Sequence, residues 1–302
     1  MRVLLIGCGR WGAKIAERLY KLSSGDLLIA DLRPEAFSQI DTMRGGEYPI
    51  SFYPRYEAVL GQDTLHACVV ATPPDTHYEI AKACLEAGKH VLVEKPLALK
   101  GEHARELFAL AEKQDLVLMV DDTWRYHSAV WDLLSRPRPG QHPNFANFWW
   151  GNSRKEVSPE GLLWTLGPHP VSLMVQFLRQ RNAANRPVSV AGHITPRLIQ
   201  IDYRWETGGA FVWLSWASAD RLRQFELLWL EEGHQAAVRA FFDDRAFRAK
   251  EDPLECVCRK FLERAADPVR SCRREGWAVN VVEILEWTEK ELTTVKRSTQ
   301  SR

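Results

Sequence analysis

The sequence has almost no excess of charge, because 40 lysines and arginines are offset by 39 aspartates and glutamates. It contains no basic block either, so neither a nucleic acid nor an anionic membrane is expected as the main partner. There is no apolar run of about 18 residues, the length that crosses a bilayer, and no membrane helix is expected. The apolar start at residues 3–6 is broken by Gly7, too early for a signal peptide, and a cytoplasmic protein is predicted.

Cysteine is sparse, and its spacing argues against a metal site. Cys256 and Cys258 are separated by one residue, whereas zinc knuckles need about two to four between their cysteines. No internal repeat or low-complexity segment is present. With 302 residues, of which 45% are hydrophobic, the chain is long enough for two domains with cores of their own.

A glycine-rich stretch follows the first predicted strand, at residues 2–6, and precedes an amphipathic helix. In this setting Gly7 permits a tight turn, and Gly9 lets the backbone approach a pyrophosphate. Gly12 lets the helix pack closely on the strand, and the helix N-terminus faces the phosphates. The pattern predicts a dinucleotide-binding turn; the alternative is a glycine turn without a ligand.

The second predicted strand, residues 27–30, ends in Asp31, 19 residues after Gly12. A carboxylate at this place accepts hydrogen bonds from the ribose hydroxyls and repels a 2′-phosphate, which favours NAD over NADP. Arg33 lies two residues further on and can offset that repulsion, so NADP stays open.

Strands and helices alternate over the first part of the chain. Strands are predicted at residues 67–70, 91–93 and 116–120, with a helix from about Thr76 to Gly88 and another at 102–112. This alternation predicts a doubly wound parallel sheet. The predicted fold class is therefore α/β, with an NAD(P)-binding Rossmann domain at residues 1–122.

The strand at residues 91–93 ends in Glu94, Lys95 and Pro96. Proline cannot donate to a sheet ladder, so Lys95 is expected at the carboxyl end of a strand, the edge where α/β sheets bind ligands. There it can donate to a substrate oxygen and stabilise a developing alkoxide. The alternative is a solvated surface lysine.

Residues 123–302 have a different character and are predicted to form an α+β domain. Five segments alternate with period two and predict an open, largely antiparallel sheet. Helical pattern is found at 160–179, interrupted by Gly167, Pro168 and Pro170, and again near the end of the chain. The predicted elements are a loop at 136–140, strands at 145–150, 188–194, 198–205, 210–217, 224–230 and 235–241, hairpin turns at 207–209 and 232–233, helices at 253–266 and 275–294, and a frayed tail at 296–302.

Three stretches resemble the Gfo/Idh/MocA oxidoreductases, the glucose-fructose oxidoreductase and inositol dehydrogenase group. They are the N-terminal glycine turn, ATPPDTH at residues 71–77, and AGKHVLVEKP at residues 87–96. The resemblance implies an NAD(P)-dependent dehydrogenase or reductase whose second domain binds the substrate and makes the contacts of a homodimer or homotetramer. It implies NAD, with NADP as the other possibility, held by Gly7, Gly9, Arg10, Trp11, Gly12, Asp31, Arg33, Thr72, Pro73, His77, Glu94 and Lys95. For His77 the alternative is a surface residue.

The family's second catalytic element is a helix with an aspartate, a histidine four residues on, and often a later acid. His169 matches the histidine, Thr165 stands where the aspartate is usual, and Pro170 or Ser172 stands where the later acid is. The resemblance implies Lys95 and His169 as catalytic residues, to which Tyr126 is added as an auxiliary acid, although packing explains a tyrosine equally well. The predicted substrate contacts are Lys95, Arg125, Tyr126, Trp164, Thr165 and His169.

The predicted function is hydride transfer between a nicotinamide and a hydroxyl or keto carbon of a sugar, a cyclitol or a nucleotide sugar. Three alternatives remain open on the same fold: an NAD-dependent glycosidase or lyase, an imine or pigment reductase, and a cofactor-binding protein without catalysis. The missing acids around His169 motivate the last of these.

Overall fold

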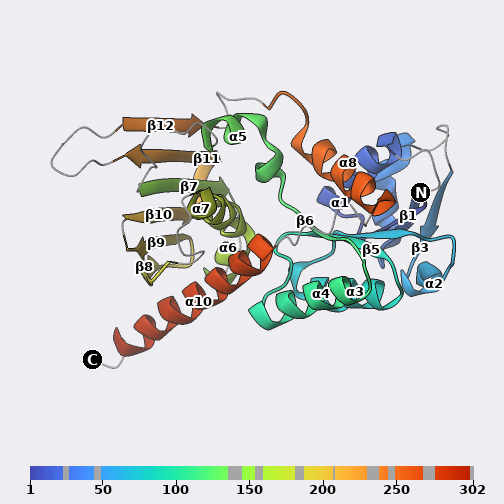
Figure 1. Ribbon diagram of the computed structural model, residues 1–302, viewed down its shortest axis with the longest axis horizontal. Helices are drawn as coiled ribbons and strands as arrows, with labels where there is room; N and C mark the ends of the chain where they lie inside the picture. The colour runs from blue at the N-terminus through green and yellow to red at the C-terminus, as the bar shows by residue number, and fades with distance from the viewer. Residues whose placement is uncertain are drawn as a thin grey trace. The chain divides into compact units, whose positions relative to one another are not determined.

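The computed structural model describes residues 1–22, 27–43, 49–134, 145–153, 159–180, 187–206, 208–229, 238–243, 249–267 and 276–299. The chain divides into two compact units, whose elements are labelled in Figure 1. Unit 1 comprises Met1–Tyr126 and Glu251–Val279, and unit 2 comprises His127–Lys250 and Asn280–Arg302. The return of the chain to unit 1 at Glu251 differs from the single boundary at residue 122, and no pattern in the sequence indicated it.

Unit 1 is built on a six-stranded parallel sheet with the order β3-β2-β1-β4-β5-β6. Its strands are β1 (Val3–Ile6), β2 (Leu27–Ala30), β3 (Ile50–Tyr53), β4 (Ala67–Val70), β5 (His90–Glu94) and β6 (Leu118–Asp121). Ile6 pairs with Ala30 on one side and with Val70 on the other, so the strands end at a common edge. The strand order reverses at β1 and β4, which opens a crevice at that edge. The predicted Rossmann fold is confirmed.

Helices cover both faces of this sheet. Figure 1 shows α1 (Arg10–Leu22) and α8 (Pro253–Ala266) on one face, and α3 (His77–Glu86) and α4 (Gly101–Lys113) on the other. Ile15 and Leu19 of α1 share one buried cluster with Val257 and Phe261 of α8. These pairs stand four residues apart, so each lies on one face of its helix. Short elements complete the unit: η1 (Pro34–Met43), α2 (Glu57–Leu60), η2 (Pro74–Thr76) and η3 (Thr123–Tyr126).

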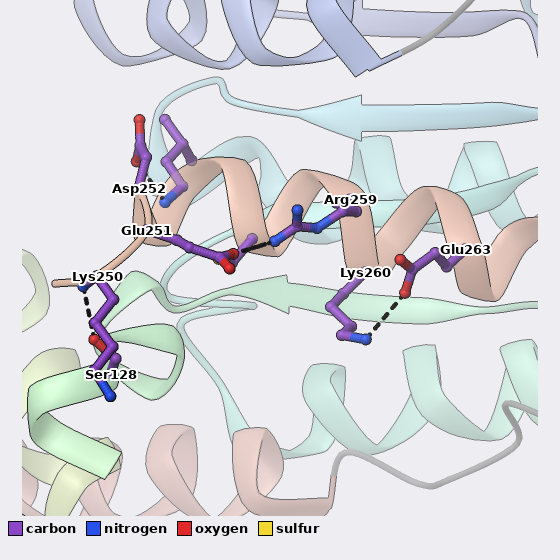
Figure 2. Close-up of polar contacts among 9 residues, drawn as sticks. Ser128, Lys250, Glu251, Asp252, Arg259, Lys260 and Glu263 are labelled. Carbon is purple, nitrogen blue, oxygen red and sulfur yellow. Dashed lines mark hydrogen bonds and ion pairs between the residues drawn. The ribbon is translucent and has the colours of Figure 1, made fainter. Parts of the chain in front are cut away.

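The start of α8 is fixed by a helix cap that also reaches α1. Asp252 Oδ1 accepts a hydrogen bond of 2.9 Å from the N–H of Leu254, and Pro253 occupies the first turn. Oδ2 of the same carboxylate accepts a hydrogen bond of 3.0 Å from Arg18 Nε on α1. Figure 2 shows Asp252 at this helix start and the ion pair between Glu251 and Arg259 beside it. The sequence predicted a helix over these residues, 253–266, and the cap explains where it begins.

Unit 2 contains a mixed sheet with the order β12-β11-β7-β10-β9-β8. Its strands are β7 (Phe145–Ser153), β8 (Ser189–Ile194), β9 (Leu198–Trp205), β10 (Gly208–Ser215), β11 (Ala217–Trp229) and β12 (Val238–Asp243). Among the described strands of this sheet, β7 and β10 alone pair in parallel, so the largely antiparallel prediction is confirmed. Trp205 pairs with Gly208 across the first predicted hairpin. Thr207, the turn at 232–233 and the loop at 136–140 lie outside the described residues.

Two elements, β11 and the last helix, extend well beyond their predicted bounds in unit 2. β11 begins at Ala217 rather than at residue 224, because a register shift between Ala217 and Leu222 interrupts the alternation that marks a strand. The last helix, α10 (Gly276–Thr299), continues to Thr299, so the predicted frayed tail is wrong for residues 296–299. Residues 300–302 lie outside the described part of the chain.

One face of this sheet is covered by helices. They are α6 (Pro159–Leu166), α7 (Pro168–Gln180) and part of α10, with α5 (Ser128–Leu134) near β12. A buried hydrogen bond of 2.8 Å joins Tyr203 Oη on β9 to Thr288 Oγ1 on α10. Among the described helices, none is both long enough and apolar enough to cross a membrane.

Candidate functional site

The glycine turn brings three backbone segments into close contact at the edge of the sheet. Gly7 has φ +93°, and a Cβ there would lie 2.6 Å from the carbonyl oxygen of Ala71. A Cβ at Gly12 would lie 2.1 Å from the carbonyl oxygen of Gly7. At Gly9, by contrast, the nearest atom to such a Cβ is an Arg33 nitrogen at 3.7 Å, so space is open beside it. Close packing at two glycines and open space at the third fit a turn that admits a phosphate group.

Asp31 is held at the end of β2 by the backbone around it. Its Oδ2 accepts a hydrogen bond of 2.8 Å from the N–H of Cys8, and its Oδ1 accepts one of 2.9 Å from the N–H of Arg33. The Arg33 side chain, 58% exposed, adds an ion pair of 3.1 Å. Burial favours the neutral form, but the hydrogen bonds from Arg33 and Cys8 outweigh it and lower the pKa of Asp31. The carboxylate is therefore fixed and charged.

A cleft of about 750 Å³ opens over the turn, within the usual range for small-molecule sites. Eight of the twelve predicted cofactor residues line it: Gly7, Gly9, Arg10, Trp11, Asp31, Arg33, Thr72 and Pro73. The other four, Gly12, His77, Glu94 and Lys95, do not line it, and their contact with a cofactor stays a prediction. A cleft of this size, with a glycine cradle and a fixed acid, fits a dinucleotide.

Lys95 is half-buried and directly follows β5. Its neighbour Glu94 is 9% exposed and pairs in register with Asp121, the last residue of β6, which is 2% exposed. Trp11 of α1 donates its indole N–H to Asp121 Oδ2 over 3.2 Å. Two buried carboxyl groups therefore lie beside Lys95, and one of them is linked to the wall of the cleft.

The two carboxyl groups differ in how strongly they hold a proton. Burial raises the pKa of Glu94 well above its usual range, and the charge of Asp121 adds to the rise. Burial raises the pKa of Asp121 to about 6, although the hydrogen bonds from Trp11 and Glu94 oppose the rise. Burial thus favours the protonated form of Glu94, whereas Asp121, with a pKa of about 6, is mostly ionised at neutral pH.

The raised pKa of Asp121 predicts a pH-dependent gain in stability for Asp121→Asn. In the folded protein this carboxyl binds its proton up to about pH 6, so its contribution to stability is present in acid and is lost as the pH rises through that value. Asparagine still accepts the Trp11 hydrogen bond but never ionises. We expect the variant to exceed the wild type by on the order of 1–3 kcal/mol at about pH 8, and not at about pH 4, in urea unfolding.

The matched control is Asp63→Asn, because Asp63 lies in the same unit and is exposed. It should change stability by less than about 0.5 kcal/mol at either pH. An Asp121→Asn variant that gains the same stability at both pH values would show that its effect is unrelated to ionisation.

His77 lies at the start of α3 and is 1% exposed, so the alternative that it is a surface residue is wrong. Its Nδ1 lies 2.7 Å from the carbonyl oxygen of Pro96, and its Nε2 lies 2.8 Å from the carbonyl oxygen of Thr72. The ring thus lies between the segment after β5 and the segment after β4.

The remaining predicted site residues divide between the two units. In unit 1, the Arg125 guanidinium stacks 4.2 Å from the Trp277 ring centre, and Tyr126 packs against the buried cluster of α1 and α8. In unit 2, His169 is the second residue of α7 and is half-buried, as is Thr165 on α6. Trp164 Nε1 donates to Glu289 Oε1 on α10 over 3.0 Å. The catalytic and substrate-binding roles of these residues stay predictions.

Sequence reasoning missed two parts of the site. Asp121 could have been found, because it ends an apolar strand next to the strand that carries Lys95. The cleft wall at Pro54–Glu57 follows β3, a strand of only four residues, all of them half-buried, which is too short to stand out in the sequence. The structure groups no three His, Cys, Asp or Glu side chains as metal ligands within its described residues.

The family model described as an oxidoreductase family with an NAD-binding Rossmann fold matches residues 1–122. Over these residues the chain is therefore similar to the Gfo/Idh/MocA oxidoreductases. The match covers the glycine turn, Asp31 and Lys95, and confirms the resemblance of the N-terminal motifs to this family.

Curated Gfo/Idh/MocA relatives match over part of their length. Four oxidoreductases, 26–35% identical to this chain, are matched over only 33–46% of their own length. A longer match, 28% identical, covers 71% of this chain and 74% of dTDP-3,4-didehydro-2,6-dideoxy-alpha-D-glucose 3-reductase from Streptomyces antibioticus.

Solved structures show that the fold extends over both units. GenD2 from gentamicin A biosynthesis, in complex with NAD, aligns with TM-score 0.77 at 20% identity over 97% of this chain and 94% of its own. KijD10, a 3-ketoreductase from Actinomadura kijaniata in complex with NADP and TDP-benzene, aligns with TM-score 0.75 at 18% identity, covering 96% and 97% of the two chains. At these identities the likeness concerns the fold alone.

Proposed function

We propose that the protein is an NAD(P)-dependent oxidoreductase that acts on a hydroxyl or keto carbon of a sugar-like substrate. A bound nicotinamide supplies the hydride acceptor or donor. The observation that carries the proposal is the position of one imidazole. Thr72 in the cleft wall and Pro96 beside Lys95 lie within 2.8 Å of opposite nitrogens of the His77 ring. The predicted catalytic residue Lys95 is therefore next to Pro96, and only the His77 ring separates Pro96 from Thr72 in the wall of a cleft that fits a dinucleotide.

The proposed substrate class is a sugar, a cyclitol or, most specifically, a nucleotide-linked sugar. The support comes from relatives whose names state reactions at the 3-position: a dTDP-sugar 3-reductase, a UDP-N-acetylglucosamine 3-dehydrogenase and a 3-ketoreductase. A keto group or hydroxyl at such a carbon is an oxygen that a lysine ammonium can hydrogen-bond.

The proposed roles follow from the chemistry of the side chains. Lys95 donates to the substrate oxygen and stabilises the charge that develops on it. His169 takes or returns the proton of that oxygen, with Tyr126 as an auxiliary acid. Thr165 offers His169 a hydroxyl partner in place of a carboxylate, and the proposal holds that this suffices to orient the ring. Arg125 and Trp164 complete the proposed substrate contacts.

Titration of NADH and NADPH against tryptophan fluorescence tests the cofactor half of the proposal, since Trp11 lines the cleft and is 38% exposed. We expect NADH to bind more tightly. Asp31→Ala should weaken NADH about tenfold, because hydrogen bonds from the ribose to a charged acceptor are lost. Arg33→Ala should lower the affinity for NADPH more than the affinity for NADH. The Arg33 guanidinium now pairs with Asp31, and a 2′-phosphate would need it as its own partner.

Asp63→Ala, at an exposed acid in the same unit, is the control and should change neither affinity. If neither nucleotide quenches the wild-type fluorescence or displaces a nicotinamide probe, the enzyme proposal fails.

We also propose a homodimer or homotetramer formed through the open face of the unit 2 sheet. Trp149 and Trp213 are in register on the neighbouring strands β7 and β10, and both are only half-buried. Aromatic side chains of this kind are enriched in interfaces. Light scattering should give the mass of two or four chains, and a single-chain mass would reject the proposal.

The proposed place of action is the cytoplasm, and the free thiols of the described cysteines suit a reducing compartment.

A further inference from the structure

The imidazole of His77 lies between two main-chain carbonyl groups that belong to different loops. The distances are 2.7 Å from Nδ1 to Pro96 O and 2.8 Å from Nε2 to Thr72 O, both within hydrogen-bond range. The side chain is 1% exposed, so water does not compete for either carbonyl. A side chain held in this way sets the separation of the two loops.

Neither of the two loop residues is held by the sheet itself. The last paired residues of the neighbouring strands are Val70 on β4 and Val93 on β5. Thr72 and Pro96 lie beyond them, where the ladder no longer fixes the spacing of the chain. On the Thr72 side, the turn is tightened by a hydrogen bond of 2.7 Å from Thr76 Oγ1 to Thr72 Oγ1. The bridge through His77 is therefore a direct link between this turn and the residue that follows Lys95.

The proton content of the ring determines how complete this bridge is. A carbonyl oxygen can only accept a hydrogen bond. Both contacts are therefore hydrogen bonds when both ring nitrogens carry a proton, whereas only one contact is a hydrogen bond when the ring is neutral. The pKa of His77 is lowered, because burial outweighs the two carbonyl contacts, which raise it. The nearby charge of Lys95 also lowers this pKa, and that of Asp75 raises it. On α4, the neighbouring helix, the carboxylate of Glu106 accepts hydrogen bonds from Lys82 and Tyr78 of α3 rather than from His77. In either form at least one N–H donates.

We propose that His77 is a positioning residue that holds the Lys95 segment at a fixed distance from the wall of the cofactor cleft at Thr72. This proposal rests on the proposed role of Lys95 in the reaction. His77 itself touches neither substrate nor cofactor in this assignment, and it acts through the two carbonyl groups. Its loss is expected to displace Lys95 without opening the glycine turn.

The reactivity of the Lys95 amine tests the proposal without any substrate. Limited acetylation with acetic anhydride, read peptide by peptide in the mass spectrometer, gives the rate at Lys95 and at Lys82 on α3 in one sample. We expect His77→Phe to change the Lys95 rate by about threefold or more, because a displaced amine differs in exposure and pKa, while the Lys82 rate stays constant. An equal change in the Lys82 rate would mean that α3 itself has loosened, and it would overturn the proposal that His77 positions the Lys95 segment.

His90→Phe is the matched control. His90 begins the same strand that ends next to Lys95, and its Nδ1 accepts a hydrogen bond of 3.1 Å from the N–H of Val117. The substitution removes an imidazole with a main-chain contact from the far end of β5. The Lys95 rate should stay at the wild-type value, and a change equal to that of His77→Phe would overturn the proposal.

Two conservative variants separate the two arms of the bridge. Asparagine can place its N–H near the Nδ1 position and keep the bond to Pro96, whereas glutamine can place its N–H near the Nε2 position and keep the bond to Thr72. We expect His77→Asn to keep the wild-type acetylation rate at Lys95 and to weaken NADH. His77→Gln should do the reverse. Equal behaviour of the two variants would mean that the residue only fills space, and would overturn the proposal.

Protection by NADH separates this proposal from the proposed function. In the wild type, bound NADH should slow the acetylation of Lys95 and leave Lys82 unaffected. Protection without a difference between the asparagine and glutamine variants would reject the positioning role and leave the proposed function standing. A difference at Lys95 without protection would support the bridge and reject the placement of Lys95 at the cofactor.

Discussion

Lys95→Met is expected to lower kcat by about 10²–10³-fold with a nucleotide-sugar substrate, while the affinity for NADH stays within about threefold. Methionine keeps the length and packing of the side chain but cannot donate to the substrate oxygen. Lys95 is half-buried, and burial raises the pKa of its neighbour Glu94 well above the usual range, which favours the neutral form of that carboxyl group. Single-turnover absorbance of NADH separates the chemical step from binding.

Lys82→Met is the control for this measurement. Lys82 lies in the same unit, where it forms an ion pair of 2.7 Å with Glu106 on the surface of α3 and α4. Its loss should leave kcat unchanged. Full turnover in Lys95→Met would contradict the proposed function at its centre and favour a protein that binds a cofactor without catalysis.

Gly12→Ala is expected to abolish NADH binding and to destabilise unit 1 by about 3 kcal/mol or more. The added Cβ would lie 2.1 Å from the carbonyl oxygen of Gly7, and backbone cannot move aside as a flexible side chain can. Gly7 has no room to retreat, because its own Cβ position lies 2.6 Å from the carbonyl oxygen of Ala71. Urea unfolding and NADH titration measure the two effects.

Two other glycines separate folding from binding in this experiment. Gly61→Ala meets no atom within 4 Å and should leave both the stability of unit 1 and the NADH affinity close to wild type. Gly9→Ala meets only the tip of Arg33, at 3.7 Å, so it should fold normally and still lose NADH affinity, because its methyl group enters the cleft. Normal NADH binding by Gly9→Ala would mean that the pyrophosphate does not lie over this turn.

The sequence predicted the parts of the site that depend on short local patterns. A buried strand followed by spaced glycines and an acid identifies the turn and Asp31, because each residue type has one physical task there. Pro96 identifies the end of β5, and hence the edge of the sheet on which Lys95 lies. Both patterns need no knowledge of how distant segments pack.

The parts that the sequence did not predict depend on contacts between distant segments. The pairing of Glu94 with Asp121 follows from the register of two strands, and that register is fixed only when the sheet forms. The pKa of Asp121 follows from its burial, which the helices on the sheet complete. For His77 the sequence left a cofactor contact and a surface residue open, and it indicated neither of the two partners, because they are main-chain carbonyls that any sequence supplies.

The return of the chain to unit 1 at Glu251 has a consequence for synthesis on the ribosome. Ile15 and Leu19 emerge early, yet Val257 and Phe261, which share their buried cluster, emerge more than 230 residues later. Until then, the apolar face of α1 has no partner from α8, and exposed faces of this kind are what chaperones bind. Unit 1 therefore cannot mature as a nascent N-terminal domain, and we expect a chain that stops at residue 250 to aggregate even though every strand of the parallel sheet is present.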